Sequence, residues 1–424
     1  TVPGTPAVEP GGSTGEVAAD DGAPGAGVPG AEGGAGEETA VTQPAGGNGG
    51  ATDVGITEGE ILLGNISTLT GPVPGLFRGA LVGAQAWAAY QNAQGGIHGR
   101  KVRIVPADDR FDGNANRAAA SDLEKKTFAL LGSFSVVEDG GAGVIKQTGV
   151  PDIGYALSTA RRTLPNQYSP LPAPEGWVLG PLNWYKERKG AAVVTNIAGF
   201  YGDVPASESN YRNMKAAAES VGWRYLFDQP LQPTESNYTA YVIRMRQQNA
   251  RGLVMTFDVS GMARMAKAVQ QQGLKLDLPL YGPNAYDRKF LELAGSAAEG
   301  TTFWMTNLLF GGEDDHPEVR LFNTYLKKVA PGFSPDVFAL YSWASGRLFA
   351  QAAAAGPPQM TRKALLEQLS KIDQFDSNGL LAPTGPASKR PSTCFVIVEI
   401  RGGRFVRVDP ASGYRCDKGG YFRL

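Results

Sequence analysis

The fold is set by a stretch that begins with the apolar run ILLGNI at residues 61–66 and continues into the polar turn STLTGP at 67–72. A short apolar run that stops at such a turn is typical of a buried strand. Residues 77–94 follow with apolar side chains three and four positions apart, which predicts a helix that two glycines end. The next run, VRIV at 102–105, predicts a second strand. The stretch therefore indicates a strand–helix–strand unit with parallel strands.

The same alternation continues along the chain. Two blocks, 60–155 and 190–305, consist of apolar strands that alternate with helices, which indicates parallel sheets covered on both faces. A helical stretch at 317–372 and a β-hairpin at 394–408 follow. The fold class is therefore α/β, with two doubly wound lobes. The further strands are predicted at 128–132, 151–155, 191–195, 252–257 and 278–282, and the further helices at 114–127, 143–148, 208–221, 238–248 and 262–272.

Charge and composition set the first 55 residues apart from the rest. They contain 16 Gly, 6 Pro and 8 acidic residues but no Lys, Arg or aromatic residue. Such a segment buries too little apolar surface to offset its ordering entropy, so we expect residues 1–55 to form a disordered acidic tether. The whole chain of 424 residues carries 40 basic and 41 acidic side chains, a net charge of −1. This balance argues against a nucleic-acid partner.

Several other classes of protein lack support in the sequence. No run of 18 apolar residues is present, so we expect no membrane span. The two cysteines, Cys394 and Cys416, have no neighbouring Cys or His, which argues against a metal site. They are expected to form a disulfide, and two buried thiols are the alternative. From residue 56 on there is no G-x-S-x-G, P-loop or H-E-x-x-H motif, so we expect neither an enzyme nor a bound cofactor.

Ligands of open α/β sheets bind beyond the carboxyl ends of the strands. The candidate ligand-binding side chains are therefore those that directly follow the predicted strands. For the serines and Asp258, helix capping is the alternative role, and for the tyrosines it is ordinary packing. The candidates are Thr70, Ser133, Ser135, Val136, Tyr155, Leu157, Ser158, Thr159, Tyr201, Asp258, Asn284 and Tyr286.

One stretch of the sequence matches a pattern that is specific to a known family. Residues 91–102, QNAQGGIHGRKV, resemble the helix exit of the branched-chain amino acid (Leu/Ile/Val-type) ABC-transporter substrate-binding proteins. Weaker similarities occur in the family's order at 69–72, 108–109, 200–202 and 341–344, so the resemblance covers 56–424. It implies a type I periplasmic-binding-protein fold, in which three hinge crossovers join two lobes. The implied segments are 56–173 and 304–382 in lobe 1, and 174–303 and 383–424 in lobe 2.

The resemblance also implies a function. A protein of this family is extracytoplasmic, captures a small-molecule solute between its lobes and delivers it to a membrane ABC permease. We expect a monomer whose tether leads to a lipid anchor upstream of Thr1. The alternatives are a ligand-sensing receptor module of the same fold and an envelope interaction protein without a transport role.

Individual residues match the family's binding positions. The family holds the ligand carboxylate with lobe 1 hydroxyl and backbone N–H groups, which match 133–136 and 157–159, where Ser135 and Ser158 are hydroxyl donors. Tyr201 matches its lobe 2 tyrosine, and Phe77 is the expected replacement for its shielding aromatic residue. Where the family has an acidic residue that binds the ligand ammonium, this sequence has Gly261. Either Asp258 takes over that role or the ligand has no ammonium, so amino-acid-like compounds, amides, and aromatic or hydrophobic acids all stay open.

Overall fold

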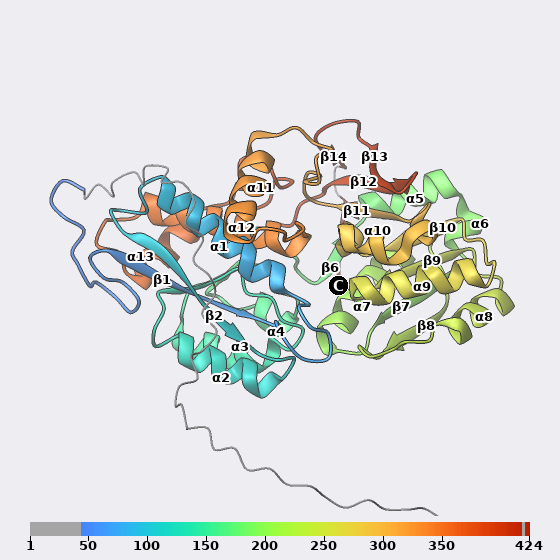
Figure 1. Cartoon of the computed structure of the whole chain (residues 1–424), viewed down its shortest axis with the longest axis horizontal. Coiled ribbons are helices and arrows are strands. Elements are labelled where there is room, and N and C mark those ends of the chain that lie inside the picture. Colours follow the sequence, from blue (N-terminus) through green and yellow to red (C-terminus); the bar gives the residue numbers. More distant parts are fainter. Residues whose placement is uncertain (1–43, 418–419) are drawn as a thin grey trace, which may run out of the picture. The chain divides into compact units, whose positions relative to one another are not determined.

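The computed structural model describes residues 44–417 and 420–424 (Figure 1). Most of the expected tether, residues 1–43, lies outside the described residues. β-Sheets at the centre of two lobes, each flanked by helices, confirm the predicted fold class.

The end of the expected tether belongs to the folded part of lobe 1. The fully buried Arg100 guanidinium donates to the backbone oxygens of Asn48 (2.6 Å) and Gly50 (3.0 Å). Thr52 Oγ1 donates to the backbone oxygen of Met360 at 2.5 Å. The expectation of disorder up to residue 55 is therefore wrong for 44–55, because backbone oxygens in this segment accept the hydrogen bonds of the buried Arg100 Nη2 group, which would be costly to bury without them.

Lobe 1 is built on a five-stranded parallel sheet. Its strand order changes direction between β1 and β3, because β2 lies on one side of β1 and β3 on the other. Such a reversal leaves a crevice at the carboxyl ends of the two strands. The order across the sheet is β2 (Lys101–Asp108), β1 (Glu60–Ser67), β3 (Ala129–Leu131), β4 (Asp152–Ile153) and β5 (Gln167–Tyr168). The helices are α1 (Arg78–Ala93), α2 (Gly113–Leu123), α3 (Asp139–Thr148), α4 (Thr159–Arg162), α11 (Pro317–Val329), α12 (Val337–Ala355) and α13 (Arg362–Leu369).

Close packing of α1 on α12 brings a late part of the sequence against the first strands. A Cβ atom on Gly83 of α1 would lie 2.0 Å from the backbone oxygen of Ala339 on α12. In return, a Cβ atom on Gly346 of α12 would lie 2.0 Å from the Trp87 ring of α1. Glycine at both positions lets the two helix axes approach, which fixes the start of α12 at the lobe 1 crevice.

Lobe 2 contains a seven-stranded path of mixed direction, parallel from β8 to β11 and antiparallel at β12 and β13. The order is β8 (Tyr225–Leu231), β7 (Ile197–Gly202), β9 (Gly252–Thr256), β10 (Leu278–Tyr281), β11 (Thr302–Met305), β12 (Cys394–Arg401) and β13 (Arg404–Asp409). A second reversal of order lies between β7 and β9. The helices are α5 (Gly180–Lys189), α6 (Ala191–Val194), α7 (Pro205–Ser220), α8 (Thr239–Gln247), α9 (Val259–Gln271), α10 (Arg288–Ala294) and the short η1 (Pro283–Ala285) and η2 (Gly295–Ala298).

One predicted strand is a helix. Residues 191–194 form α6, and the strand β7 begins only at Ile197. Val193 and Val194 are buried in the core of lobe 2. This apolar run can pack against the core as a helix or as a strand. A short apolar run has too few residues for its period to distinguish a strand from a buried helical turn.

The chain passes between the lobes three times: after β5, after β11 and before β12. Near the first passage, β6 (Gly176–Val178) pairs with β15 (Tyr421–Arg423) and lies between the two groups of elements in Figure 1. The strand β14 (Arg415–Cys416) pairs with β12, which sets Cys394 opposite Cys416, and the two cysteines form the predicted disulfide.

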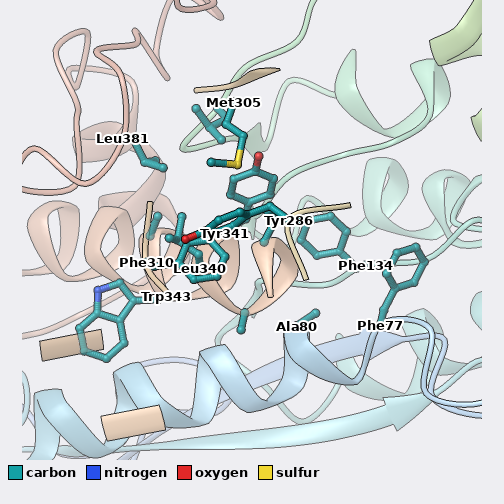
Figure 2. Close-up of a cluster of buried hydrophobic side chains, with 14 of the residues drawn as sticks. Phe77, Ala80, Phe134, Tyr286, Met305, Phe310, Leu340, Tyr341, Trp343 and Leu381 are labelled. Carbon is teal, nitrogen blue, oxygen red and sulfur yellow. The ribbon is translucent and has the colours of Figure 1, made fainter. Parts of the chain in front are cut away.

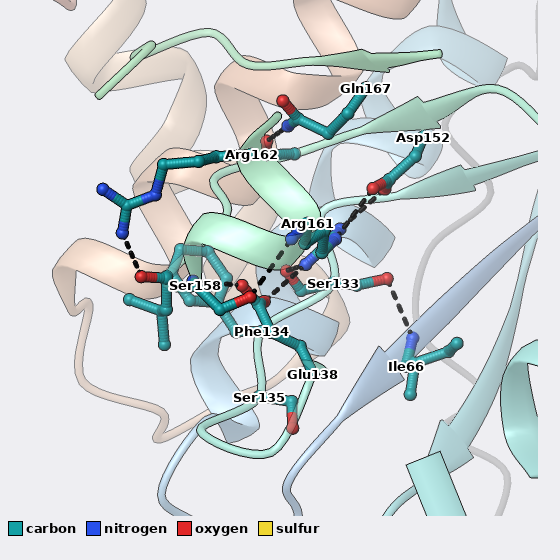
Figure 3. A network of polar contacts seen from close by, with 12 residues as sticks. Ile66, Ser133, Phe134, Ser135, Glu138, Asp152, Ser158, Arg161, Arg162 and Gln167 are labelled. Atoms are coloured by element: carbon teal, nitrogen blue, oxygen red, sulfur yellow. Dashed lines mark hydrogen bonds and ion pairs between the residues drawn. The ribbon is translucent and has the colours of Figure 1, made fainter. Parts of the chain in front are cut away.

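A buried ion triad fixes the loop before the first passage (Figure 3). The Arg161 guanidinium is 2.6 Å from Asp152 Oδ1 and 2.8 Å from Glu138 Oε2, and all three side chains are at most 3% exposed. Glu138 Oε1 also accepts the Ser158 backbone N–H at 2.6 Å. Burial raises the pKa of Glu138, and the Arg161 charge opposes that rise. The triad therefore holds α4 against the sheet of lobe 1.

Candidate functional site

A cavity of about 280 Å³ lies between the two lobes, where both strand-order reversals leave their crevices. Residues that follow β1, β3 and β4 line it from lobe 1, and residues that follow β7, β9 and β10 line it from lobe 2. The three passages also contribute, through residues such as Ala173, Thr306 and Ser392. The cavity is therefore lined by both lobes and by the segments that join them.

Five aromatic side chains form one wall of the cavity, which we call the aromatic wall: Phe77, Phe134, Tyr155, Phe338 and Tyr341. Phe134 is at the centre, 5.6 Å from Phe77, 5.8 Å from Tyr155, 5.2 Å from Phe338 and 6.4 Å from Tyr341 between ring centroids. Figure 2 shows the Phe77 and Phe134 rings side by side, with Tyr341 beyond Phe134. Such a wall presents apolar surface to a ligand and leaves hydroxyl groups only at its tyrosines.

Both tyrosines of the aromatic wall keep their protons. Burial raises the pKa of Tyr155 and of Tyr341, so each hydroxyl is neutral at physiological pH. The Tyr341 hydroxyl donates to Asn307 Oδ1 at 3.3 Å. These groups therefore offer hydrogen bonds to a ligand without adding a charge.

Asp258 is the carboxylate that lines the cavity from lobe 2. Its Oδ1 caps α9 by accepting the backbone N–H groups of Ser260 (2.9 Å) and Gly261 (3.0 Å). Its Oδ2 is buried and has no hydrogen-bond partner among the described residues. Capping is therefore one role of this side chain, and its second oxygen leaves room for the predicted ligand contact. Nearby, Asn284 Nδ2 donates to the backbone oxygen of Phe257 at 2.7 Å.

The remaining polar groups gather where the chain first passes between the lobes. The Arg162 guanidinium donates to the backbone oxygens of Ala173 (3.0 Å) and Leu157 and to Asn210 Oδ1 (3.1 Å). The residues that accept these three bonds all line the cavity. Trp177 lines it as well, and its indole N–H is buried without a partner in the described part of the chain.

The structure brings some of the predicted binding residues together at this cavity. Those that line it are Phe77, Val136, Tyr155, Leu157, Asp258 and Asn284. They come from both lobes and follow five different strands, as expected of residues beyond the carboxyl ends of parallel strands.

The predicted lobe 1 hydroxyls do not line the cavity, because backbone groups use them. Ser133 Oγ accepts the N–H of Ile66 at 3.0 Å, and Ser135 Oγ accepts that of Val137 at 3.0 Å. Ser158 Oγ caps α4, of which Thr159 is the first residue. Thr70 is exposed, and its Oγ1 donates to Asp108 Oδ2 at 2.5 Å.

The two predicted lobe 2 tyrosines are part of its core. Tyr201 stacks on Tyr211 with ring centroids 4.7 Å apart. The Tyr286 hydroxyl is hydrogen-bonded to Glu313 and accepts the Gly311 backbone N–H at 2.8 Å. Packing, the alternative role weighed for these tyrosines, is the one they have in this structure.

Sequence reasoning missed most of the aromatic wall and the groups at the first passage. Phe134 lies between two serines that were chosen for their hydroxyls, and Tyr341 lies in a segment quoted only for its similarity to a family. Trp177 and Arg162 follow no predicted strand. An aromatic residue at a strand end was the available signal for Phe134, and the sequence carried no comparable signal for Arg162.

The described part of the chain contains no helix that is long and apolar enough to cross a membrane.

Comparison with known proteins identifies the family. The family profile described as "Periplasmic binding protein" matches residues 60–404. The "Leu/Ile/Val-binding protein homolog 1" of Brucella abortus is 24% identical over 327 residues, which are 73% of this chain and 83% of that protein.

Solved structures share the fold. A fatty acid ABC transporter substrate-binding protein from Thermomonospora curvata aligns with a TM-score of 0.73 and 19% identity, over 89% of this chain and 97% of its own. A branched-chain amino acid ABC transporter protein from Thermus thermophilus with bound valine aligns with a TM-score of 0.72 and 16% identity, over 85% and 97%. An R. palustris solute-binding protein in complex with 4-hydroxybenzoate aligns with a TM-score of 0.67 and 16% identity, over 86% of this chain and 97% of its own. With its two-lobed fold, its interlobe cavity and a profile match over most of its length, this chain belongs to the periplasmic binding protein family.

Proposed function

We propose that this protein works outside the cytoplasm, where it captures a small solute with an apolar body in the cavity between its lobes. It then delivers the solute to a membrane ABC permease. The observation that carries this proposal is the aromatic wall, which faces a cavity reached by both lobes. Apolar pockets with a few polar groups are typical of small-molecule sites.

The size and chemistry of the cavity favour a compact amphipathic ligand. Its volume of about 280 Å³ suits a molecule of amino-acid or benzoate size, or a folded short acyl chain. The named ligands of the structural neighbours, a fatty acid, valine and 4-hydroxybenzoate, each combine an apolar body with a carboxyl group. This shared chemistry supports the same class here, and the position of Gly261 supports acids without an ammonium.

Binding is expected to shift the molecule toward a closed arrangement of its lobes. Lobe 1 offers the aromatic wall, and lobe 2 offers Thr256, Asp258 and Asn284. A ligand that contacts both faces binds the closed arrangement more tightly, and only this difference in affinity moves the equilibrium. A permease then distinguishes the closed, loaded form from the open one.

A thermal-shift screen followed by calorimetry tests the proposal on the full chain. The panel contains branched-chain amino acids, amides, aromatic acids and straight-chain fatty acids. At a hundredfold excess over Kd, a true ligand stabilises the folded state by about 2.7 kcal/mol. For a chain of this size, this stabilisation raises the Tm by roughly 2 to 4 °C. Absence of binding across the panel would count against capture of such solutes and favour an envelope role without a ligand.

A matched pair of variants locates the binding site. Phe338→Ala removes a half-buried ring of the aromatic wall, and Phe405→Ala removes a half-buried ring on β13 that does not line the cavity. We expect the first variant to weaken binding about 10-fold or more, since an aromatic contact in a binding pocket contributes about 1.5–3 kcal/mol. The second should keep the wild-type Kd. Equal losses of affinity in the two variants would show that the ligand does not bind at the aromatic wall.

A further inference from the structure

The loop that follows β2 holds two consecutive residues in the left-handed region of backbone conformation. Arg110 has a φ of 54° and Phe111 a φ of 64°. Residues with a large side chain rarely adopt this region, and they stay in it only where the surrounding structure holds them there. Such positions cluster at ligand clamps, and Phe111 lines the cavity between the lobes. The conformation therefore serves to bring the Phe111 ring to the cavity.

Two aspartates at the carboxyl end of β2 hold this loop. Asp108 Oδ1 accepts the backbone N–H of Arg110 at 2.9 Å, and Asp109 Oδ1 accepts that of Phe111 at 3.0 Å. Asp109 is fully buried, and its Oδ2 accepts Asn116 Nδ2 on α2 at 3.0 Å. The backbone of Phe111 is therefore anchored to both β2 and α2.

The loop that follows β1 lies directly on the loop that carries Phe111. Asp108 Oδ1 also accepts the backbone N–H of Thr70 at 3.2 Å. A Cβ atom on Gly71 would lie 2.8 Å from the backbone oxygen of Arg110 and 3.0 Å from Phe111 Cβ. The two loops therefore form one unit. We call it the lobe 1 rim, and it consists of residues 69–76 and 108–112.

The lobe 1 rim lies at the mouth of the cavity. Val73 and Phe111 line the cavity from the rim, and Val204 and Pro233 line it from lobe 2. Each of these four side chains is half-buried and stands between two exposed neighbours in the sequence. By contrast, the lining residue Met255 is fully buried. We therefore place the mouth of the cavity between the four half-buried side chains.

We infer that Phe111 limits the length of the solute that the protein accepts, because its ring covers the apolar body of the solute at the mouth of the cavity. This inference rests on the proposed function and adds a limit on size to it. The hydrogen bonds of the lobe 1 rim keep its backbone in place, so an apolar body that reaches the ring meets a fixed obstacle. A shorter body stays beneath the ring and gains apolar contact with it. Phe111 is thus a specificity-determining residue that favours short apolar bodies over long chains.

The test measures Kd by calorimetry on the full chain with three homologous series. These are straight-chain fatty acids, 4-alkylbenzoates and straight-chain 2-amino acids, each lengthened one carbon at a time from a propyl to a decyl chain. In the wild type, each added CH2 should tighten binding about 4-fold until the body reaches the ring, which corresponds to about 0.8 kcal/mol per buried CH2. The first member beyond this cut-off should bind about 10-fold more weakly than the best member, because it overfills the cavity.

Three variants locate the cut-off. Phe111→Gly removes the ring, and glycine adopts a φ of 64° freely, so the loop keeps its conformation. Phe111→Tyr keeps the ring, and Leu69→Ala is the matched control because Leu69 is half-buried in the lobe 1 rim but does not line the cavity. We expect Phe111→Gly to bind the first member beyond the wild-type cut-off about 10-fold more tightly than the wild type does. Phe111→Tyr and Leu69→Ala should keep the wild-type cut-off.

The outcomes separate this inference from the proposed function. A cut-off that stays at the same chain length in Phe111→Gly overturns the inference alone, because the protein still captures a solute. If no member of any series binds the wild type, the proposed function fails and the inference fails with it. Phe111→Asn repeats the comparison if Phe111→Gly does not fold, since asparagine also tolerates this backbone region. A wild type whose affinity rises up to the decyl chain overturns the inference without any variant.

Discussion

Asp336 is an ionisable residue whose environment works against its charged form. Its carboxylate caps α12 through the Ala339 N–H at 2.7 Å and lies so close to α1 that a Cβ atom on Gly79 would be 2.1 Å from Oδ1. Burial, opposed by the capping hydrogen bond and reinforced by the nearby Asp287 charge, raises the pKa of Asp336 to about 7. The folded protein therefore holds this proton more tightly than the unfolded chain does.

The raised pKa predicts a pH-dependent contribution to stability. The contribution of Asp336 is fully present below the ordinary carboxyl pKa, near 4, and is lost as the pH rises through about 7. Asp336→Asn keeps a good N-cap residue and removes the titration. We expect the excess of its Tm over that of the wild type to be larger at pH 8.5 than at pH 5. Parallel curves of Tm against pH for the two proteins would contradict this assignment.

The C-terminal strands act at the scale of elements, because they complete a wall of the cavity from a distant part of the sequence. The disulfide between Cys394 and Cys416 ties β14 to β12, and the chain then continues to β15, which holds β6. Tyr421 on β15 and Trp177 on β6 both line the cavity. The covalent link therefore restrains the strand that holds Trp177 in the wall of the cavity.

Loss of the disulfide should affect both the stability of the protein and the local opening of β15. The bonded cysteines are 22 positions apart, and a loop of this size is expected to contribute about 3 kcal/mol to stability in the chain-entropy model. We expect Cys394→Ser with Cys416→Ser to lower the free energy of unfolding by that amount and to speed hydrogen exchange at 421–423. Urea unfolding and exchange mass spectrometry measure both. Reduction of the wild type is the control, and an unchanged exchange rate at 421–423 would show that β15 needs no such restraint.

At the scale of the whole molecule, binding between lobes predicts a change in their arrangement. Spin labels on Arg117→Cys and Lys267→Cys report across the lobes, since Arg117 is exposed on α2 and Lys267 on α9. Labels on Arg117→Cys and Lys363→Cys measure a distance within lobe 1 and serve as the control. The compound with the largest thermal shift should move and narrow only the first distance distribution. A ligand that leaves both unchanged would bind without closure.

Sequence patterns predicted the architecture better than the site, for physical reasons that particular residues show. The long apolar runs of β1 and β9 predicted parallel strands, and each of the two pairs in parallel with both of its neighbours. The short run at 191–195 was misread, since four or five apolar residues fit a helical turn equally well. The strand ends were found, but Ser133 and Ser135 give their hydroxyls to the backbone while Phe134 between them faces the cavity. Tyr341 and Trp177 reach the site only through tertiary packing, which no local pattern encodes.

The pairing of β15 with β6 has a consequence for how the protein is made. The cavity takes residues from Val73 to Tyr421, so its wall is spread over most of the order in which a ribosome releases the chain. The strands of the lobe 1 sheet end at residue 168 and its covering helices at Leu369, whereas the cavity wall is incomplete until β15 has emerged and paired. A nascent chain can thus complete lobe 1 before it acquires its capacity to bind a solute. An incompletely synthesised molecule that has folded lobe 1 therefore does not compete with finished ones for the ligand.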